Sequence, residues 1–518
     1  MAGWDDGYVT DVVYTTNFYR EITPIWLATT CLLLGQRPPD LTRPFRYADL
    51  GCGHGFTALV IAATYPDAEV WGFDFNPAHV EFARDVAARA GLTNAHFTET
   101  SFADLTNAAP SGFPDFDMMV SHGVLSWISP DNRRHLISTI GRKLKPGGLI
   151  YLSYNVTTGW AAMVPVRALM RMLTVASPER TDLAVPSVLD FVDRLKQAGA
   201  TFFHAHTTLE SRLQDIRKQD ARYIAHEYLN KDWHPLMFAD IAAELAEAKC
   251  RYIGSATLAE NIDNISVPAN VVPLLAEMRD PMLRETLRDI GCAQTFRRDL
   301  FRRGVAPMPA AQQQSLIEGM TLIGLGRQPP ESGITFATPI GNVTGLPAIY
   351  DPLLSLLDAA PLSIGQARQA ASLGERSLLE LMQAFTLLVA GGYALPALPD
   401  GGTAAGRDAA RRLNAVIAAV NRNAGELTQL AAPVLGSALA SEPLETLVVG
   451  ELIGGEQPDV QPLVTKVLDV LSRSGRSVQR DGQPVKDPVE ANLVMTDAIR
   501  GVLERRLPVM RRVGVVEG

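Results

Sequence analysis

Cysteine is scarce in this chain. Its 518 residues include four cysteines, and no two of them form a CxxC pair. So few and so widely spaced thiols cannot build a disulfide framework, and they lack the ligand spacing of a structural zinc site. The isolated pair His204 and His206 has no third ligand near it in the sequence. We therefore expect a reducing compartment, the cytoplasm, and no bound metal.

Basic residues are in deficit, and long apolar runs are missing. Lys and Arg number 47 against 56 Asp and Glu, which gives a net charge of −9. Surfaces that bind phosphate need the opposite balance, so we expect no nucleic-acid partner and no polybasic membrane contact. No run approaches the roughly 20 apolar residues of a membrane-spanning helix. The acidic first residues do not predict a signal peptide.

Strand and helix patterns alternate over the first 155 residues. Helices are expected at 55–64 and 77–90, each between two strand patterns. This βαβ order predicts a doubly wound parallel α/β sheet. The expected strands are 46–50, 69–73, 95–99, 117–121 and 149–154.

The rest of the chain predicts three further units around this sheet. One of them is a helical insertion, residues 161–221. It carries apolar residues without an obvious partner, such as Met170 and Met172, which indicates a homodimer interface. Alternatively, they cover the sheet of their own subunit. The arginine pairs at 297–298 and 302–303 predict a solvated helix face. The expected boundaries are 1–160 and 222–265 for the discontinuous sheet domain, 161–221 for the helical insertion, 266–395 for a mixed α+β middle domain with a winged-helix-like unit, and 408–518 for a mainly helical C-terminal domain.

The strongest local signal is the segment Asp49-Leu50-Gly51-Cys52-Gly53-His54-Gly55, in which glycines follow a strand and precede a helix. Such glycines let the backbone pass close to a ligand. A dinucleotide fingerprint would need glycine at position 56, where Phe56 stands, so the spacing favours a nucleoside without a pyrophosphate. An ordinary tight turn is the alternative.

Further signals follow at the ends of the next strands. Asp74 ends the second strand, near the spacing of about 20 residues expected for a carboxylate that binds ribose hydroxyls. Its alternative role is to cap the following helix, although Asn76 before Pro77 suits that role better. Ser101 and Phe102 follow the third strand, where an adenine edge would lie.

Together these segments resemble the class I S-adenosylmethionine-dependent methyltransferases. The matching pieces are 49–55, 70–74, 101–102, 117–124 and 144–148. The resemblance implies a Rossmann-like methyltransferase sheet and S-adenosyl-L-methionine as cofactor. The family pattern has Asp where this chain has Ser101, whose hydroxyl can still accept from the adenine amine. The residues that this resemblance places at the cofactor are Tyr14, Tyr19, Asp49, Gly51, Cys52, Gly53, Gly55, Asp74, Phe75, Ser101, Phe102, His122, Gly123 and Trp127.

More closely, the chain resembles methyltransferases with a regulatory-domain extension, among them rickettsial protein lysine methyltransferases. The resemblance rests on 14–19, 122–127, 153–155 with 159–160, 226–229 and 294–299, and it fades over the last hundred residues. It implies N-methylation of lysine side chains in a protein substrate. A small-molecule amine or another metabolite is the alternative acceptor. A third possibility is a non-catalytic regulator that senses the cofactor.

Four residues are candidates for the acceptor channel. A lysine nucleophile must be neutral, which costs roughly 4–5 kcal/mol at pH 7. A dry aromatic channel lowers that cost, and a histidine or carboxylate can take the proton. Packing anchors are the alternative for the aromatic residues, and a structural hydrogen-bonded pair is the alternative for the last two. The candidates are Tyr154, Trp160, His226 and Glu227, with Tyr14 expected to close over the cofactor.

Overall fold

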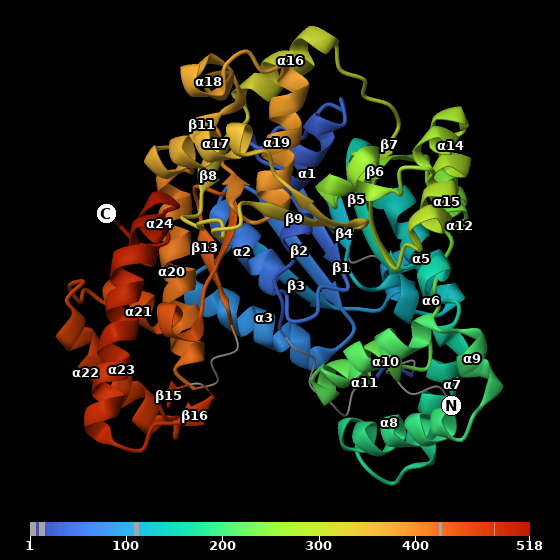
Figure 1. Cartoon of the computed structure of the whole chain (residues 1–518), viewed down its shortest axis with the longest axis horizontal. Coiled ribbons are helices and arrows are strands. Elements are labelled where there is room, and N and C mark those ends of the chain that lie inside the picture. Colours follow the sequence, from blue (N-terminus) through green and yellow to red (C-terminus); the bar gives the residue numbers. More distant parts are fainter. Residues whose placement is uncertain (1–6, 10–15, 108–112, 424–426, 481, 518) are drawn as a thin grey trace.

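A seven-stranded sheet forms the centre of the molecule (Figure 1). The structure, a computed structural model, describes residues 7–9, 16–107, 113–423, 427–480 and 482–517. The strand order is β3-β2-β1-β4-β5-β7-β6, in which β1 to β5 run parallel and β7 runs antiparallel to both of its neighbours. This arrangement confirms the predicted doubly wound α/β fold. The strands are β1 (Arg46–Leu50), β2 (Glu69–Asp74), β3 (Ala95–Glu99), β4 (Phe116–Ser121), β5 (Leu144–Asn155), β6 (Cys250–Ser255) and β7 (Phe296–Arg303).

Helices cover both faces of the sheet, which is why its central strands β1 and β4 are almost wholly buried. Successive residues of a strand point to opposite faces. Leu149 and Tyr151 of β5 therefore join one apolar cluster, whereas Ile150 and Leu152 join the other. The first face carries α1 (Pro24–Leu33), α2 (Phe56–Thr64) and α3 (Pro77–Ala90), and the second carries α4 (Phe102–Asn107), α5 (Pro130–Lys143) and α12 (Phe238–Glu247).

Strand β7 corrects two predictions. It lies between β5 and β6, so the sheet uses residues beyond the predicted boundary at 265. Its arginines were expected on a solvated helix face, yet Arg297 and Arg302 are each only 4% exposed. Arg297 is paired with Asp289 and Asp299, and Arg302 donates to backbone carbonyls. The burial of Arg297 is tolerated because its donors are satisfied, whereas the Nε of Arg302 has no hydrogen-bond partner among the described residues.

The helical insertion has an apolar core of its own. Met163, Met170 and Val188 are buried among residues of its other helices, whereas Met172 is 67% exposed. Most of its apolar residues thus pack within the insertion, and the homodimer stays a prediction. Between β5 and α12 the chain forms α6 (Thr157–Trp160), α7 (Met163–Ala176), α8 (Thr181–Gln197), α9 (Thr201–Ala205), α10 (Thr208–Arg217) and α11 (Ala221–Tyr228).

The middle of the chain begins with short helices against the β6 edge of the sheet. They are η3 (Leu258–Asn261), α13 (Asp263–Ser266), α14 (Val272–Glu277) and α15 (Pro281–Cys292). A three-stranded sheet, β11-β8-β12, and a separate hairpin follow. Helices lie beside the small sheet, and the winged-helix-like unit stays a prediction. These elements are α16 (Ala310–Gly319), β8 (Thr321–Gly324), β9 (Thr335–Thr338), β10 (Gly341–Thr344), α17 (Pro347–Ala359), β11 (Leu362–Ser363), α18 (Ile364–Gln369), η4 (Ala371–Leu373), α19 (Leu378–Ala390) and β12 (Ala394–Pro396).

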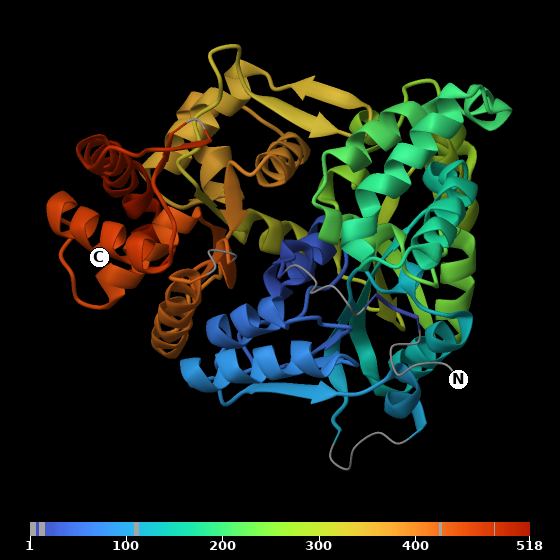
Figure 2. The same cartoon turned by 90° about the horizontal axis from the view of Figure 1, so that it is seen from below.

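The C-terminal region is mainly helical and lies across the central sheet from the insertion (Figures 1 and 2). Within the part of the chain that the structure describes, no helix is both long and apolar enough to cross a membrane. The elements are α20 (Ala404–Asn421), β13 (Gln429–Ala432), β14 (Ser437–Ala440), α21 (Pro443–Ile453), α22 (Val460–Arg473), β15 (Gln479–Arg480), β16 (Gln483–Pro484), α23 (Pro488–Gly501), the π-helical turn Val502–Arg506 and α24 (Leu507–Arg512).

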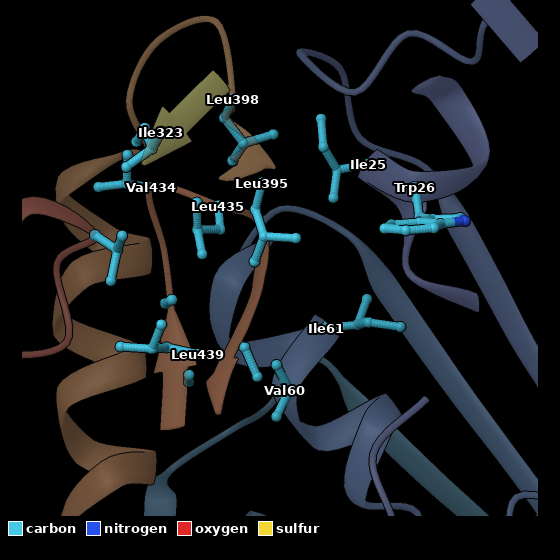
Figure 3. Close-up of a cluster of buried hydrophobic side chains, with 14 of the residues drawn as sticks. Ile25, Trp26, Val60, Ile61, Ile323, Leu395, Leu398, Val434, Leu435 and Leu439 are labelled. Carbon is cyan, nitrogen blue, oxygen red and sulfur yellow. The ribbon is translucent and has the colours of Figure 1, made fainter. Parts of the chain in front are cut away.

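One apolar cluster joins the C-terminal region to α2, the helix that follows the glycine loop. Figure 3 shows Val60 and Ile61 of α2 beside Leu395, Leu435 and Leu439. All five side chains are at most 2% exposed. Burial of such aliphatic side chains stabilises the folded state by about 1.5–3 kcal/mol each. The C-terminal region therefore supports the helix that positions the glycine loop.

Candidate active site

A cavity of about 630 Å³ opens at the carboxyl ends of β1, β2 and β4. Open α/β sheets bind their ligands at this edge. Asp49 and Gly55 are not part of its wall, and Tyr14 lies outside the described residues. The cavity brings together the other residues predicted at the cofactor, namely Tyr19, Gly51, Cys52, Gly53, Asp74, Phe75, Ser101, Phe102, His122, Gly123 and Trp127.

The glycine loop takes its shape from left-handed residues. The φ angles are 85° at Gly51, 54° at Gly53 and 66° at Gly55. A Cβ atom at Gly51 would lie 2.6 Å from Val124, and one at Gly55 would lie 2.5 Å from Phe97. A Cβ atom at Gly53 would meet nothing within 4 Å. Gly53 thus borders open space, and its bare backbone is suited to close contact with a ligand.

Asp74 ties the end of β2 to this loop. The Gly53 N–H donates to Oδ2 at 2.8 Å, and the Asn76 N–H donates to Oδ1 at 2.9 Å. His79 Nδ1 lies 3.3 Å from the same Oδ1. A carboxylate can accept about four hydrogen bonds, so Asp74 retains capacity for a ribose hydroxyl. The helix is capped by Asn76, whose side chain accepts from the Ala78 N–H.

Two predicted cofactor residues have other contacts. Asp49 is 4% exposed behind the loop, and burial, with a further contribution from Asp74, raises its pKa to about 7. The Ser101 hydroxyl donates to Asp104 Oδ2 at 2.7 Å and accepts from the Asp104 N–H at 3.1 Å. Ser101 therefore begins α4, and its hydroxyl is partly used there. Phe75 and Phe102 remain as apolar surfaces for a flat base.

His122, which follows β4, forms the centre of another wall. Its ring stacks on Tyr19 with centroids 3.8 Å apart, and its Nδ1 lies 2.9 Å from the Tyr151 hydroxyl. Burial, assisted by the positive charge of Arg298, lowers the pKa of His122 to about 3. The imidazole is therefore neutral near pH 7 and serves as a flat, uncharged surface.

Trp160 lines the cavity on the side of the helical insertion. Its Nε1–H donates to the Thr295 carbonyl at 2.8 Å, and the Arg212 guanidinium carbon lies 4.0 Å from the ring centroid. One indole edge is thus anchored and one face is covered by a cation. This places Trp160 in the wall where the acceptor channel was expected.

Helix α11 contributes His226 and Glu227 to the same cavity. His226 is 3% exposed, and its ring centroid lies 5.7 Å from that of Tyr8. Burial raises the pKa of Glu227 to about 7 and that of nearby Tyr223 to about 12. A cavity carboxyl that titrates near neutral pH is suited to proton transfer.

Tyr154 does not line the cavity, so its predicted place in the acceptor channel is wrong. It is fully buried, and its hydroxyl donates to Asp299 Oδ2 at 2.5 Å. The reason is strand alternation: Asn155 reaches the cavity, and the preceding residue of β5 points into the opposite layer. Tyr154 is a structural residue.

Sequence reasoning missed several wall residues. Phe296 and Arg298 lie within a segment that carried the family resemblance, but the expectation of a helix there hid their place at the sheet edge. Tyr8 belongs to an amino-terminal segment without a periodic pattern. His54 could have been found, because it lies between the second and third glycines of the loop.

Comparisons with known proteins agree with this geometry. Residues 42–237 match a methyltransferase domain model, and residues 220–303 match a predicted methyltransferase regulatory domain. The chain is 32% identical over 513 residues to an uncharacterised protein of Synechocystis sp., with 99% of each chain covered. It is 33% identical over 170 residues to a trans-aconitate 2-methyltransferase of Methylobacterium radiotolerans, which is 33% of this chain and 58% of that one.

A solved structure, PKMT2 from Rickettsia typhi in complex with AdoHcy, shares the fold. The TM-score is 0.70 at 19% identity, and the match covers 97% of this chain and 100% of that one. The open glycine loop, the carboxylate of Asp74 and the cavity volume suit a nucleoside with a short polar extension. The cofactor is S-adenosyl-L-methionine. The chain belongs to the S-adenosylmethionine-dependent methyltransferases that carry a methyltransferase regulatory domain.

Proposed function

We propose that this methyltransferase methylates the ε-amino group of lysine side chains in a protein substrate. The bound cofactor supplies a methyl group activated by a sulfonium. The observation that carries the proposal is Glu227, a carboxyl that faces the same cavity as the glycine loop and Asp74. The family resemblance of the motifs around Trp127, Trp160 and Glu227 supports the same acceptor.

Glu227 has the properties that a lysine acceptor requires. Lysine arrives mostly as an ammonium and must lose a proton before its nitrogen can attack. Because burial raises the pKa of Glu227 to about 7, the carboxylate can take that proton near neutral pH and is a stronger base than an exposed glutamate. In the transfer, the lysine nitrogen forms the new N–C bond and the electron pair of the broken S–C bond stays on sulfur. The proton passes from nitrogen to Glu227.

Aromatic side chains around Glu227 suit the apolar stem of lysine. Tyr8, Tyr223, Tyr228 and Trp160 all line the cavity. Such rings guide an alkyl chain and limit the access of water, which favours the neutral amine. The position of Trp160 is held by its bond to the Thr295 carbonyl.

The charge of the cavity distinguishes this proposal from a carboxylate acceptor. The relative from Methylobacterium radiotolerans is named for trans-aconitate, a carboxylate. Here the cavity wall contains the carboxyls Asp74, Glu227 and Asp232 against one arginine, Arg298. This balance favours a cationic group that becomes a neutral amine. A small-molecule amine has the same chemistry and is separated from lysine by experiment.

The test is incorporation of radiolabelled methyl groups by the purified protein, with and without cell lysate. We expect label in protein that yields N-methyllysine after acid hydrolysis. Label in small amines or in base-labile esters would overturn the lysine assignment. Binding of the cofactor without any turnover would identify a regulator instead. A Glu227→Gln variant assayed in parallel reports whether the labelling depends on this carboxyl.

A further inference from the structure

A second cavity, of about 550 Å³, lies beside β6, the edge strand of the sheet. It is bounded by β6, by η3, α13 and α15, and by α19 of the middle domain, and it shares no wall residue with the active-site cavity. Most of its polar wall falls within residues 220–303, the part that matches the regulatory-domain model. The catalytic reaction described above uses none of these residues.

Helix α15 turns a charged face toward this cavity. Its buried residues are Glu285, Arg288 and Asp289, whereas Leu283 is 59% exposed and Ile290 is 61% exposed. This is the reverse of the usual arrangement, in which a helix buries its apolar stripe. Buried charge costs free energy unless it is paired, so the inversion indicates a face built to hold polar groups around the cavity.

The arginines that line this cavity are already engaged by protein carboxylates. Arg297 donates to Asp299 and Asp289, at 2.9 Å and 2.6 Å, and to Glu285 at 3.0 Å. Arg284 and Arg288 both pair with Asp263, and Arg288 also donates to the Glu260 carbonyl. The guanidinium groups therefore have little capacity for an anionic ligand.

One carboxylate oxygen in the wall remains without a partner. Asp289 is 1% exposed, and its Oδ1 accepts from Arg297. Its Oδ2 is buried and has no hydrogen-bond partner among the described residues. Burial raises the pKa of Asp289 to about 7 although Arg297 opposes the shift. An unpaired buried acceptor is costly, and a donor carried by a ligand would satisfy it.

Apolar side chains form another part of the wall, beside its polar groups. Leu34 after α1, Leu258 of η3 and Met382 of α19 border the cavity. The wall carries Glu260, Asp263, Glu285 and Asp289 against three arginines, so its charged groups have a negative surplus when Asp289 is ionised. No cluster of three or more His, Cys, Asp or Glu in the described ranges is suited to a metal ion. The chemistry that fits is an organic cation with N–H donors and a short alkyl chain.

We propose that this second cavity is a binding site for a primary alkylammonium, whose N–H donates to Asp289 Oδ2 while its alkyl chain lies against Leu34, Leu258 and Met382. The site is separate from the one that binds the cofactor and the methyl acceptor. It gives the regulatory-domain region a ligand of defined chemistry.

The test is calorimetric titration of the full-length protein with n-butylammonium, with n-butanol as the uncharged ligand of similar shape. Asp289→Asn keeps one oxygen for Arg297 and replaces the unpartnered oxygen with an NH₂ group. We expect it to weaken butylammonium binding by about tenfold or more, since a charge-assisted hydrogen bond is lost. Gln383→Trp, which adds bulk at the cavity from α19, should remove binding at this cavity and is decisive if the first variant does not fold.

Glu227→Gln is the matched control in the active-site cavity and should leave this binding event intact. The proposal is overturned if Gln383→Trp and a folded Asp289→Asn bind butylammonium as tightly as the parent protein. It is equally overturned if only Glu227→Gln removes the binding, or if butanol binds as well as butylammonium does.

Discussion

Replacing Glu227 with glutamine is the sharpest test of the proposed chemistry. The change keeps the size of the side chain and removes its ability to take a proton. A positioned general base contributes roughly 10²–10⁴ in rate. We therefore expect kcat at pH 7 to fall by about a hundredfold or more, which corresponds to about 2.7 kcal/mol.

The pH profile separates a base from a merely structural carboxyl. In the parent protein Glu227 is protonated below about pH 7 and ionised above it. The rate should therefore fall as the pH drops through about 7, because the base becomes occupied by a proton. In Glu227→Gln the change in rate near pH 7 should disappear. The rate should instead keep rising toward higher pH, as the lysine itself loses its proton.

The assay is methyl transfer from radiolabelled cofactor across a pH series, with the cofactor saturating. Cofactor affinity, measured by calorimetry, is the control and should not change, because no cofactor contact is assigned to Glu227. A variant with the parent rate and the same acid limb would refute the role of Glu227 as base. Loss of cofactor binding together with early melting would show that Glu227 has a structural role.

Four further changes test the cofactor site and the corrected tyrosine. Asp74→Asn should lower cofactor affinity at least tenfold by calorimetry, because a charge-assisted bond to ribose is lost; unchanged affinity would contradict the assignment. Gly55→Ala should destabilise the fold by about 2–5 kcal/mol through crowding and left-handed strain. Gly53→Ala, which meets open space, should instead impair cofactor binding with a smaller shift in Tm. Tyr154→Phe should lower stability by about 1–3 kcal/mol, since Asp299 loses a buried donor; a selective loss of methyl transfer with unchanged Tm would restore the channel role.

The parallel part of the sheet was predictable because its signals are local. The expected strands 46–50 and 95–99 match β1 and β3 in full, and each is a short segment next to a turn. The expected strand 149–154 is longer in the structure, since β5 begins at Leu144 and includes the glycine turn. Local pattern indicates where a strand lies but not how far pairing extends it.

β7 was not predictable from its own residues. The segment from Phe296 to Arg303 contains four arginines and one aspartate, which favours a solvated surface. Only the three-dimensional pairing of Arg297 with carboxylates from α15 makes its burial possible. These partners precede Arg297 by only 8 and 12 residues, but composition alone does not show that α15 packs against this strand, so it pointed to the wrong environment.

The cofactor side of the site was more predictable than the acceptor side. The glycine spacing and Asp74 at the end of β2 indicate where the cofactor binds, because the ligand-binding edge of the sheet follows directly from strand order. Tyr154 and Trp160 were assigned by position along the chain alone. Strand alternation placed the first in the core, whereas Trp160, beyond the strand end, reached the cavity.

The late arrival of β7 also has a consequence for synthesis. Tyr154 of β5 and its partner Asp299 of β7 are 145 residues apart. At roughly 5–20 residues per second, the ribosome leaves the outer edge of β5 unpaired for about 7–29 s. An open strand edge can pair with other chains, while the insertion, with its own core, can fold during the wait. Nascent chains stalled before residue 296 should therefore aggregate through β5, and chains released beyond residue 303 should not.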